Sequence, residues 1–324
     1  MKKRTKIIIT IILIFLIFVL FTPYPTVWLL RCIFKNPVYK KAQNYEQIKN
    51  KVVIKENINY NSKYDKGYLD IISPKKVDEK LPVIIWVHGG AFVAGNKEGV
   101  ESYMVMLANE GYIVVSINYS LAPKTKYPTP IKQLDEAYTF IKENSEKYNI
   151  DMNKVFLGGD SAGATIVSQF ASKETNEEYR KILNMKKVTP GDNLKGMILF
   201  CGPYDFFSLK IENKLINFVS SKVMYSYFGS KKWKDEKTLK EASVLNHITK
   251  NFPPSFITDG NTFSFEDQGK DLVKILKEKN IEVKEKFYDK KDVTLSHEYQ
   301  FQMDTKEGKE VFSLVTKFLN KKSK

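Results

Sequence analysis

The most prominent pattern in the chain is an apolar run near its N-terminus. Residues 7–21 are apolar except for Thr10. The basic residues just before this run are Lys2, Lys3, Arg4 and Lys6. The run has no polar face, and Tyr24 and Trp28 follow it, where aromatic residues are favoured at a membrane interface. The pattern therefore predicts a membrane anchor over residues 1–30.

A cleaved secretory signal peptide would begin in the same way, but small residues should follow the apolar run. The chain instead continues Phe21-Thr22-Pro23-Tyr24-Pro25, so we expect the segment to remain attached. The basic cluster before the run is closer and denser than the basic residues after it. The positive-inside rule then predicts a single span with the N-terminus in the cytoplasm and the main domain outside. Residues 31–50 would form a juxtamembrane or cap segment.

From about residue 45 the pattern changes to alternating strands and helices. The segments 81–87 (LPVIIWV) and 112–118 (YIVVSIN) are continuous apolar runs, which is typical of strands buried on both faces of a sheet. Further strands are predicted at residues 52–60, 68–72, 154–157, 194–201, 255–258 and 281–287. Apolar residues spaced by three and four predict helices at residues 131–148, 267–279 and 306–319.

Strands that alternate with helices predict an α/β fold, in which helices cover both faces of a mostly parallel sheet. We expect this fold over residues 51–324. Within it, residues 206–247 are longer than one connection between strands requires. They predict an inserted helical cap.

Composition narrows the class of protein. The chain has 324 residues, of which 43% are hydrophobic, and this excludes a disordered protein. Of its net charge of +15, about half surrounds the apolar run, where anionic lipid headgroups would attract it. We find no basic stripe interleaved with aromatic residues, so no nucleic-acid partner is expected. Three histidines and two cysteines are too few for a structural zinc site, and Cys32 and Cys201 are predicted to be free thiols.

The sharpest chemical signal is Gly159-Asp160-Ser161-Ala162-Gly163, which matches G-x-S-x-G. It lies between a predicted strand and a predicted helix, as a nucleophile elbow requires. Glycines allow the strained turn that exposes the serine hydroxyl. The motif predicts Ser161 as a nucleophile, although a serine that only caps a helix would fit the same position. Asp160 is expected to organise this loop by accepting backbone hydrogen bonds.

A second signal, His88-Gly89-Gly90, directly follows the buried strand 81–87. Ester hydrolysis passes through a tetrahedral oxyanion, which needs backbone N–H groups aimed at it. The N–H groups of Gly89 and Gly90, together with that of Ala162 after the nucleophile, are the predicted donors.

With both motifs in this order, the chain resembles the α/β-hydrolase superfamily, and within it the esterases that are similar to hormone-sensitive lipase. That branch has HGG in its oxyanion loop and GDSAG around its nucleophile. The further matching stretches are YLDI (68–71), YSLAP (119–123), AS (242–243), FPP (252–254) and HEY (297–299). The resemblance runs from about residue 50 to the C-terminus. Ser120 stands where the family usually has arginine, which weakens a structural contact rather than the chemistry.

The general base follows by elimination among three histidines. In this fold the chain order is serine, acid, histidine. His88 belongs to the oxyanion loop, and His247 precedes the strand after which the acid should come. His297 is therefore the predicted base.

The acid is less well defined. Alignment with the family places Thr262 where an aspartate should stand, and threonine cannot stabilise an imidazolium by charge. Asp259, at the end of the strand 255–258, is the preferred acid, and Glu266 is the alternative. A turn residue at Asp259 is about equally compatible with the sequence.

The sequence thus predicts a membrane-anchored serine esterase that uses no metal or organic cofactor. The resemblance implies short or medium acyl esters, and an exported site would favour lipid, glycan or other small-molecule esters. Two alternatives remain. One is an amidase or peptidase that uses the same nucleophile. The other is a catalytically inactive hydrolase fold that serves as a binding protein, which only Thr262 supports.

Overall fold

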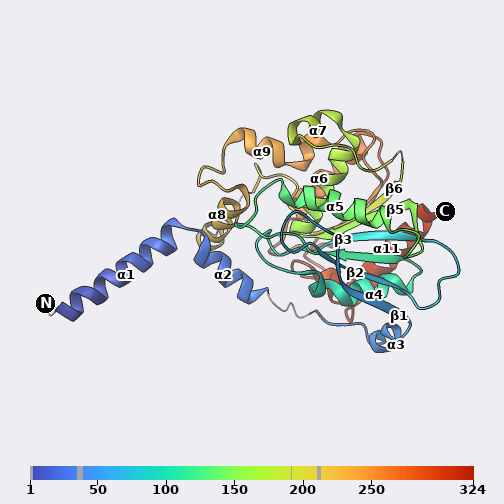
Figure 1. The fold of residues 1–324 in the computed structure, drawn as a ribbon, viewed down its shortest axis with the longest axis horizontal. Helices are drawn as coiled ribbons and strands as arrows, with labels where there is room; N and C mark the ends of the chain where they lie inside the picture. The colour runs from blue at the N-terminus through green and yellow to red at the C-terminus, as the bar shows by residue number, and fades with distance from the viewer. Residues whose placement is uncertain (1–2, 35–38, 191, 210–212) are drawn as a thin grey trace.

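The computed structural model describes residues 3–34, 39–190, 192–209 and 213–324 (Figure 1). These residues form one eight-stranded sheet in the order β1-β2-β4-β3-β5-β6-β7-β8. The strands are β1 (Val52–Asn59), β2 (Tyr68–Pro74), β3 (Leu81–Val87), β4 (Ile113–Ile117), β5 (Ile150–Asp160), β6 (Leu194–Phe200), β7 (Ser255–Thr258) and β8 (Val283–Lys286). Strand β2 pairs antiparallel with β1 and β4, and every pair from β4 to β8 is parallel. The predicted mostly parallel α/β fold is confirmed.

Helices lie on both faces of this sheet (Figure 1). They are α1 (Lys3–Phe21), α2 (Tyr24–Ile33), α3 (Tyr45–Lys49), α4 (Glu101–Asn109), α5 (Thr129–Glu143), α6 (Ala162–Thr175), α7 (Glu177–Leu183), α8 (Lys214–Phe228), α9 (Glu236–Ala242), α10 (Glu266–Glu278) and α11 (Lys306–Ser323). Short 3-10 helices span Lys97–Val100, Val244–His247 and Tyr299–Phe301. The segment predicted as a helical cap, 206–247, contains α8, α9 and the second of these 3-10 helices.

The continuous apolar strands divide the core into two clusters. Val83, Ile85 and Val87 of β3 pack on one face with α5 and α6, whereas Ile84 and Trp86 pack on the other face with α4 and α11. Successive side chains of a strand point to opposite faces, so a strand covered on both sides must be apolar throughout. This burial holds the carboxyl ends of β3, β5 and β7 together at one edge of the sheet.

Strand β5 begins earlier than the predicted 154–157. Residues 150–153 contain no apolar run, but Ile150 and Asp151 pair with the start of β3 before the register shifts at Val155. Pairing with a neighbouring strand decides the boundary here, and local hydrophobicity does not reveal it.

The N-terminal helices differ in their surroundings. Helix α1 extends away from the domain with none of its side chains buried, and it is long and apolar enough to cross a membrane, as a signal sequence would also be (Figure 1). Helix α2 starts after Pro23 and buries Thr26 and Val27. Proline cannot continue the backbone hydrogen bonds of a preceding helix, so α2 forms separately and does not lengthen the apolar span of α1.

Candidate active site

Ser161 occupies the sharp turn between β5 and α6. Its backbone has φ 50° and ψ −119°, and its hydroxyl makes no capping bond to the helix. A Cβ added at Gly163 would lie 1.9 Å from the carbonyl oxygen of Val87, so α6 approaches β3 too closely for any side chain there. The geometry is that of a nucleophile elbow rather than of a helix cap.

His297 reaches Ser161 from the loop between β8 and α11. Its Nε2 lies 3.0 Å from Ser161 Oγ, although the two residues are 136 positions apart in the chain. This distance is within the range of a nucleophile and its general base. The structure therefore brings together the nucleophile and the base that the sequence predicts.

The other histidines serve packing. The ring of His88 stacks on Tyr119, and its Nδ1 lies 2.6 Å from the carbonyl oxygen of Gly89. Burial lowers the pKa of His88 to about 4, so the ring is neutral. His247 stacks on Tyr179 at 3.8 Å between ring centres.

A second serine connects His297 to the acid. Ser264 Oγ lies 2.7 Å from His297 Nδ1, and the Ser264 hydroxyl donates a short hydrogen bond to Asp259 Oδ1. The hydroxyl proton points to the carboxylate, so the Ser264 oxygen accepts from Nδ1–H. That tautomer leaves Nε2 unprotonated and able to accept the Ser161 proton. Asp259 thus faces His297 through Ser264 and not directly.

The other candidates for the acid lie elsewhere. The Thr262 hydroxyl donates to Asn261 Oδ1 at 3.3 Å, and its amide donates to the carbonyl of Leu295. Glu266 pairs with Lys270 at 3.0 Å in the first turns of α10. Neither side chain has a contact with His297 among the hydrogen bonds and ion pairs of the described residues.

Asp259 is buried, and its burial changes the pKa of its carboxyl group. The carboxyl group is 2% exposed, and burial raises its pKa to about 6, against the opposing effects of the Ser264 hydrogen bond and the His297 ring. An aspartate with a pKa near neutrality is typical of a functional site rather than of a turn.

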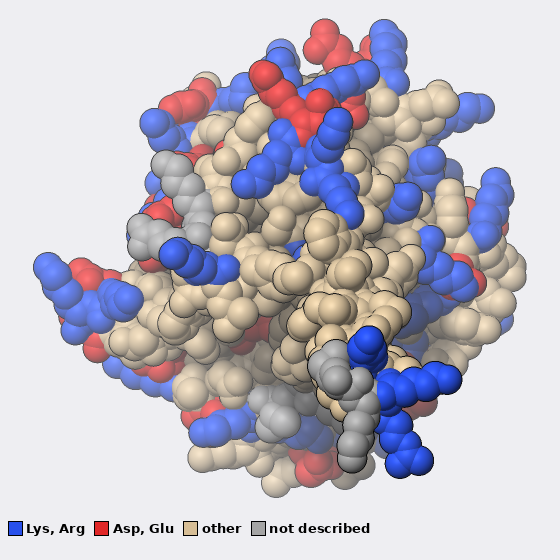
Figure 2. Space-filling view, turned by 90° about the vertical axis from the view of Figure 1, so that its left-hand side faces the viewer, with Lys and Arg blue, Asp and Glu red and all other residues tan. Residues whose placement is uncertain are grey.

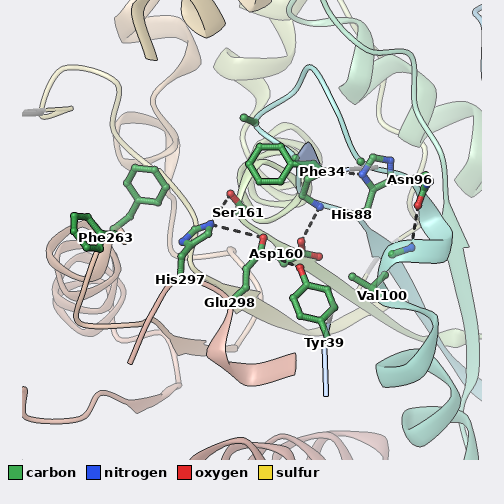
Figure 3. Close-up of a pocket in the computed structure, with 16 residues that line it drawn as sticks. Phe34, Tyr39, His88, Asn96, Val100, Asp160, Ser161, Phe263, His297 and Glu298 are labelled. Atoms are coloured by element: carbon green, nitrogen blue, oxygen red, sulfur yellow. Dashed lines mark hydrogen bonds and ion pairs between the residues drawn. The ribbon is translucent and has the colours of Figure 1, made fainter. Parts of the chain in front are cut away.

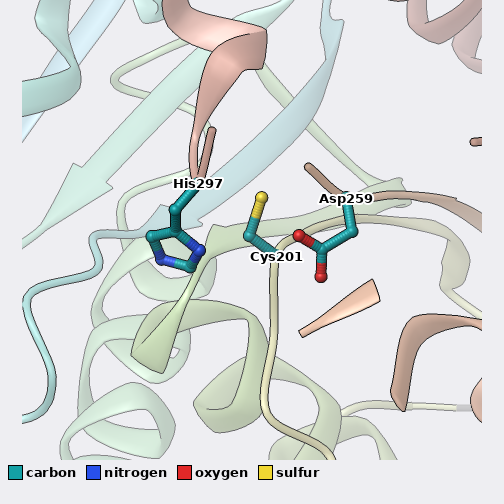
Figure 4. Close-up of side chains that lie close together, drawn as sticks. All are labelled: Cys201, Asp259 and His297. Atoms are coloured by element: carbon teal, nitrogen blue, oxygen red, sulfur yellow. The ribbon is translucent and has the colours of Figure 1, made fainter. Parts of the chain in front are cut away.

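Cys201 packs beside this acid and histidine (Figure 4). Potential ligand atoms of Cys201, Asp259 and His297 lie within 4.8 Å of one another. Burial holds the pKa of the Cys201 thiol well above its usual range, and a protonated thiol is a poor metal ligand. Both imidazole nitrogens of His297 also already face serine hydroxyls. The cluster therefore fits an acid–base pair packed on a thiol better than a metal centre.

Asp160 fixes the oxyanion loop to the elbow. Its Oδ1 accepts from Trp86 Nε1 at 2.8 Å, and its Oδ2 accepts from the amide of Gly89 at 2.7 Å. This corrects the prediction for Gly89: its N–H is committed to a carboxyl group and cannot also serve a substrate oxyanion. Asp160 has the structural role that the sequence suggests for it.

Gly90, Ala91 and Ser161 line one cavity. Ala91 has φ 55°, in the left-handed region, so the loop turns sharply after Gly90. Ala162 is the first residue of α6, where a backbone N–H has no partner within the helix. Among the described residues, no hydrogen bond from the amides of Gly90, Ala91 or Ala162 is present, so these three are the candidate donors. The sequence predicted Gly90 and Ala162.

The cavity over Ser161 has a volume of about 230 Å³ (Figure 3). The aromatic residues that line it are Phe34, Tyr39, Phe263 and Phe265. Tyr39, from the segment after α2, donates a 2.5 Å hydrogen bond to Glu298, whose other carboxylate oxygen lies 3.7 Å from His297 Nε2. The N-terminal segment therefore forms part of the wall of the site.

The sequence did not reveal Ser264, Ala91 or Glu298 as members of this site. Ser264 lies in a loop without a recognisable spacing, and only the missing acid at Thr262 indicated that another group must act on His297. Its role depends on the packing of the loop 259–265 against the loop 295–297, which no local sequence pattern indicates.

A family model described as BD-FAE matches residues 69–272, more than half of the chain. The chain belongs to the BD-FAE family. The BD-FAE match contains the oxyanion loop, Ser161, Asp259 and Ser264, and it ends before His297.

Curated relatives are similar over part of their length. The chain is 26% identical to "Esterase LipC" of Mycobacterium tuberculosis over 198 residues, which is 60% of this chain and 47% of that protein. It is 32% identical to an "Acetyl esterase" of Salmonella schwarzengrund over 97 residues, 30% of this chain and 29% of that protein. The chain thus spans less than half the length of these relatives.

Solved structures match over most of the chain. Esterase B from Lactobacillus rhamnosis has a TM-score of 0.76 at 18% identity, with 88% of each chain covered. A bacterial heroin esterase has a TM-score of 0.70 at 16% identity, with 85% of this chain and 86% of that chain covered. At these identities the likeness is one of fold, and it confirms the predicted α/β-hydrolase fold.

Proposed function

We propose that the protein is a membrane-anchored serine hydrolase of carboxylic esters. The observation that carries the proposal is the 3.0 Å distance between Ser161 Oγ, at the nucleophile elbow, and His297 Nε2. The similarity to proteins named as esterases supports the same activity.

In the first half of the reaction, Ser161 Oγ attacks the acyl carbonyl carbon while its proton moves to His297 Nε2. The tetrahedral intermediate collapses when the C–O bond to the alcohol breaks and Nε2 returns that proton to the leaving alkoxide. The acyl group then remains as an ester on Ser161.

In the second half, water attacks the acyl carbon and gives a proton to Nε2. Collapse of the new intermediate breaks the bond to Ser161 Oγ, which recovers the proton from Nε2. The carboxylic acid leaves, and both side chains return to their starting protonation states.

Ser264 and Asp259 act through His297. Nδ1–H donates to Ser264 throughout, and the Ser264 proton stays directed at Asp259. Asp259 must be ionised for this chain of hydrogen bonds to hold the tautomer, and its charge then stabilises the imidazolium at a distance of one intervening hydroxyl. This arrangement argues against an inactive binding protein, because the lack of an acid at Thr262 is compensated.

Charge on the carbonyl oxygen develops near backbone donors. Gly90 and Ala91 line the cavity of Ser161, and Ala162 directly follows it, so their N–H groups are the proposed oxyanion donors, whereas the N–H of Gly89 donates to Asp160. Donors fixed before the reaction need no reorganisation when the oxyanion forms.

The size of the cavity favours a short acyl chain. A volume of about 230 Å³ is smaller than the roughly 300–1,000 Å³ of sites for drug-sized ligands. Phe34, Phe263 and Phe265 provide an apolar lining. Acetyl and other short acyl groups are therefore the proposed substrates in preference to long fatty acyl chains.

Helix α1 would anchor the enzyme in the membrane. Its 19 residues span about 28 Å, close to the roughly 30 Å hydrocarbon core, and no side chain of α1 is buried against the domain. The basic residues at its start favour a cytoplasmic N-terminus and an external catalytic domain. Protease digestion of spheroplasts that carry a C-terminal epitope tests this topology, since an external domain loses the epitope and an internal one retains it.

A para-nitrophenyl ester chain-length series on the purified full chain tests the activity. We expect the highest kcat/KM for acetyl or butyryl esters, and a loss of at least about 10³-fold in Ser161→Ala and His297→Ala. Ser168→Ala, a buried serine of the same helix α6, is the matched control. Hydrolysis that survives in Ser161→Ala at the wild-type rate would exclude the proposed nucleophile.

A further inference from the structure

The surface from which α1 emerges exposes apolar side chains on two helices. On α2, Tyr24, Trp28, Leu29 and Ile33 are between 52% and 68% exposed, although the opposite side of this helix packs on the domain. On α8, the exposed apolar residues are Leu215, Ile216 and Phe218, with Leu215 at 71%. These seven residues are called the α2–α8 face below. A soluble protein rarely exposes many large apolar side chains together, so a group of them indicates an interaction surface.

Helix α1 holds this face close to any bilayer that it crosses. The last turn of α1 contacts α8, because Lys222 of α8 donates to the carbonyl oxygen of Leu20. The Lys231 ammonium lies 5.1 Å from the centre of the Phe21 ring. Helix α2 follows α1 after two residues and packs against α8. If α1 spans the membrane, α2 and α8 are therefore the parts of the domain nearest to the headgroups.

The charges around the face suit an anionic surface. Viewed from the side of α1, the surface around this helix carries many Lys and Arg, with fewer Asp and Glu among them (Figure 2). The basic residues beside α8 include Lys214, Lys231, Lys232 and Lys234, which are exposed. Lysines near anionic headgroups strengthen binding, while tryptophan and tyrosine are favoured at the level of the interface.

The active-site cavity opens beside this face. Phe34 directly follows α2 and lines the cavity of Ser161. Phe263 lines the same cavity and is 86% exposed. It also borders a neighbouring pocket with Leu209, in the segment that leads to α8. The cavity that contains Ser161 is therefore lined by the residue that directly follows the exposed Ile33 at the end of α2.

We propose that the α2–α8 face lies in the interfacial layer of an anionic bilayer, and that the cavity receives amphiphilic esters from that layer. This inference rests on the proposed esterase function and on anchoring by α1. A substrate held at the headgroup level would keep its apolar part in the membrane. Its short acyl ester would then enter the cavity along Phe34 and Phe263.

Depth-dependent quenching tests the placement without using activity. The full chain is inserted into vesicles of phosphatidylcholine and phosphatidylglycerol, and an environment-sensitive dye is attached to Cys32, which is exposed whereas Cys201 is buried. In a Cys32→Ser background the dye is placed instead at Leu215→Cys, at Ile12→Cys in α1, or at the control Ile182→Cys in α7. Nitroxide lipids labelled near the headgroup or deep in the acyl chain are the quenchers.

We expect shallow nitroxides to quench the dye at Cys32 and Leu215→Cys several-fold more than at Ile182→Cys, and deep nitroxides to quench it at Ile12→Cys. Quenching at Ile12→Cys without excess quenching at Leu215→Cys would overturn the proposed face while leaving the anchor intact. No quenching at Ile12→Cys would overturn the anchor and the proposal together.

Kinetics tests the delivery of substrate. Leu215→Glu combined with Ile216→Glu should lower hydrolysis of a vesicle-borne acetyl ester about tenfold and leave hydrolysis of soluble para-nitrophenyl acetate unchanged. Ile182→Glu should affect neither substrate. Equal rates on the vesicle-borne ester in the double variant and wild type would contradict the proposal, as would equal losses on both substrates with an unchanged unfolding temperature. Failure of wild type on every ester would instead contradict the esterase function.

Discussion

Ser264 Oγ lies 2.7 Å from His297 Nδ1, and the Ser264 hydroxyl donates a hydrogen bond to Asp259 Oδ1. The acid therefore acts on the base through a hydroxyl group. A direct carboxylate contact would fix the imidazole tautomer by charge and geometry together, whereas here Ser264 supplies the geometry and Asp259 the charge.

Removal of the Ser264 hydroxyl should uncouple the base from its acid. We expect Ser264→Ala to lower kcat between about 10²- and 10⁴-fold, because His297 can then adopt the tautomer that is protonated on Nε2. Ser264→Thr keeps a hydroxyl and should recover most of the loss. A low-field proton resonance from Nδ1–H should be present in wild type and Ser264→Thr and absent from Ser264→Ala. Wild-type kinetics in Ser264→Ala would contradict this role.

Asp259 should destabilise the folded protein at neutral pH. Its pKa in the folded state is about 6, above the ordinary value of 3.8, so the folded state binds this proton more tightly than the unfolded chain does. The resulting stability is fully present below about pH 4 and is lost as pH rises through 6. Asp259→Asn avoids that loss.

The unfolding temperature of Asp259→Asn relative to wild type should therefore increase between pH 4 and 7 and stay constant above pH 7, while kcat falls. The exposed Asp78→Asn is the control and should show no such trend. A difference that shrinks with rising pH would have the wrong sign.

The close contact between the elbow and β3 predicts a marked difference between two glycines. Gly163→Ala would place Cβ 1.9 Å from the Val87 carbonyl oxygen, and we expect a loss of about 3 kcal/mol or more in the free energy of unfolding. Gly269→Ala in α10 meets its nearest atom, in Phe287, at 3.3 Å, and should change stability by no more than about 1 kcal/mol. Thermal or denaturant unfolding distinguishes the two, and equal stabilities would exclude the packing described here.

The hydrogen bond from Tyr39 to Glu298 should matter for catalysis although Tyr39 lies far from Ser161 in the chain. Tyr39→Phe removes the bond and loosens one wall of the cavity, so we expect kcat/KM to fall about threefold to tenfold. Tyr45 lies in the same N-terminal segment but away from the cavity, and its hydroxyl donates to Glu101 of α4 at 3.4 Å. Tyr45→Phe removes this contact and should leave kcat/KM unchanged. Equal effects of the two variants would indicate a general loosening of the segment.

The central strands could be predicted because a strand that is buried on both faces must consist almost entirely of apolar residues. The segments 81–87 and 112–118 are apolar throughout, and β3 and β4 form there. The start of β5 could not be predicted, since Ile150 and Asp151 are held by pairing with β3 and not by their own hydrophobicity.

Some residues of the candidate site could likewise be predicted from the sequence, and others could not. Ser161 and His297 were identifiable because a local motif marks one, and three histidines leave few alternatives for the other. Ser264 was not, because its position depends on how the loop after β7 packs on the loop before His297, where the amide of Thr262 donates to the carbonyl of Leu295. Gly89 was misassigned for a related reason, since its amide could not be known to point at Asp160.

The identity of the nucleophile is tested most directly by the mass of the intact protein after treatment with a fluorophosphonate ester. We predict one covalent adduct on Ser161 in the wild-type chain, no adduct in Ser161→Ala, and strongly slowed labelling in His297→Ala. A folded wild-type protein that remains unlabelled, or an adduct that persists in Ser161→Ala, would contradict the proposed serine hydrolase mechanism.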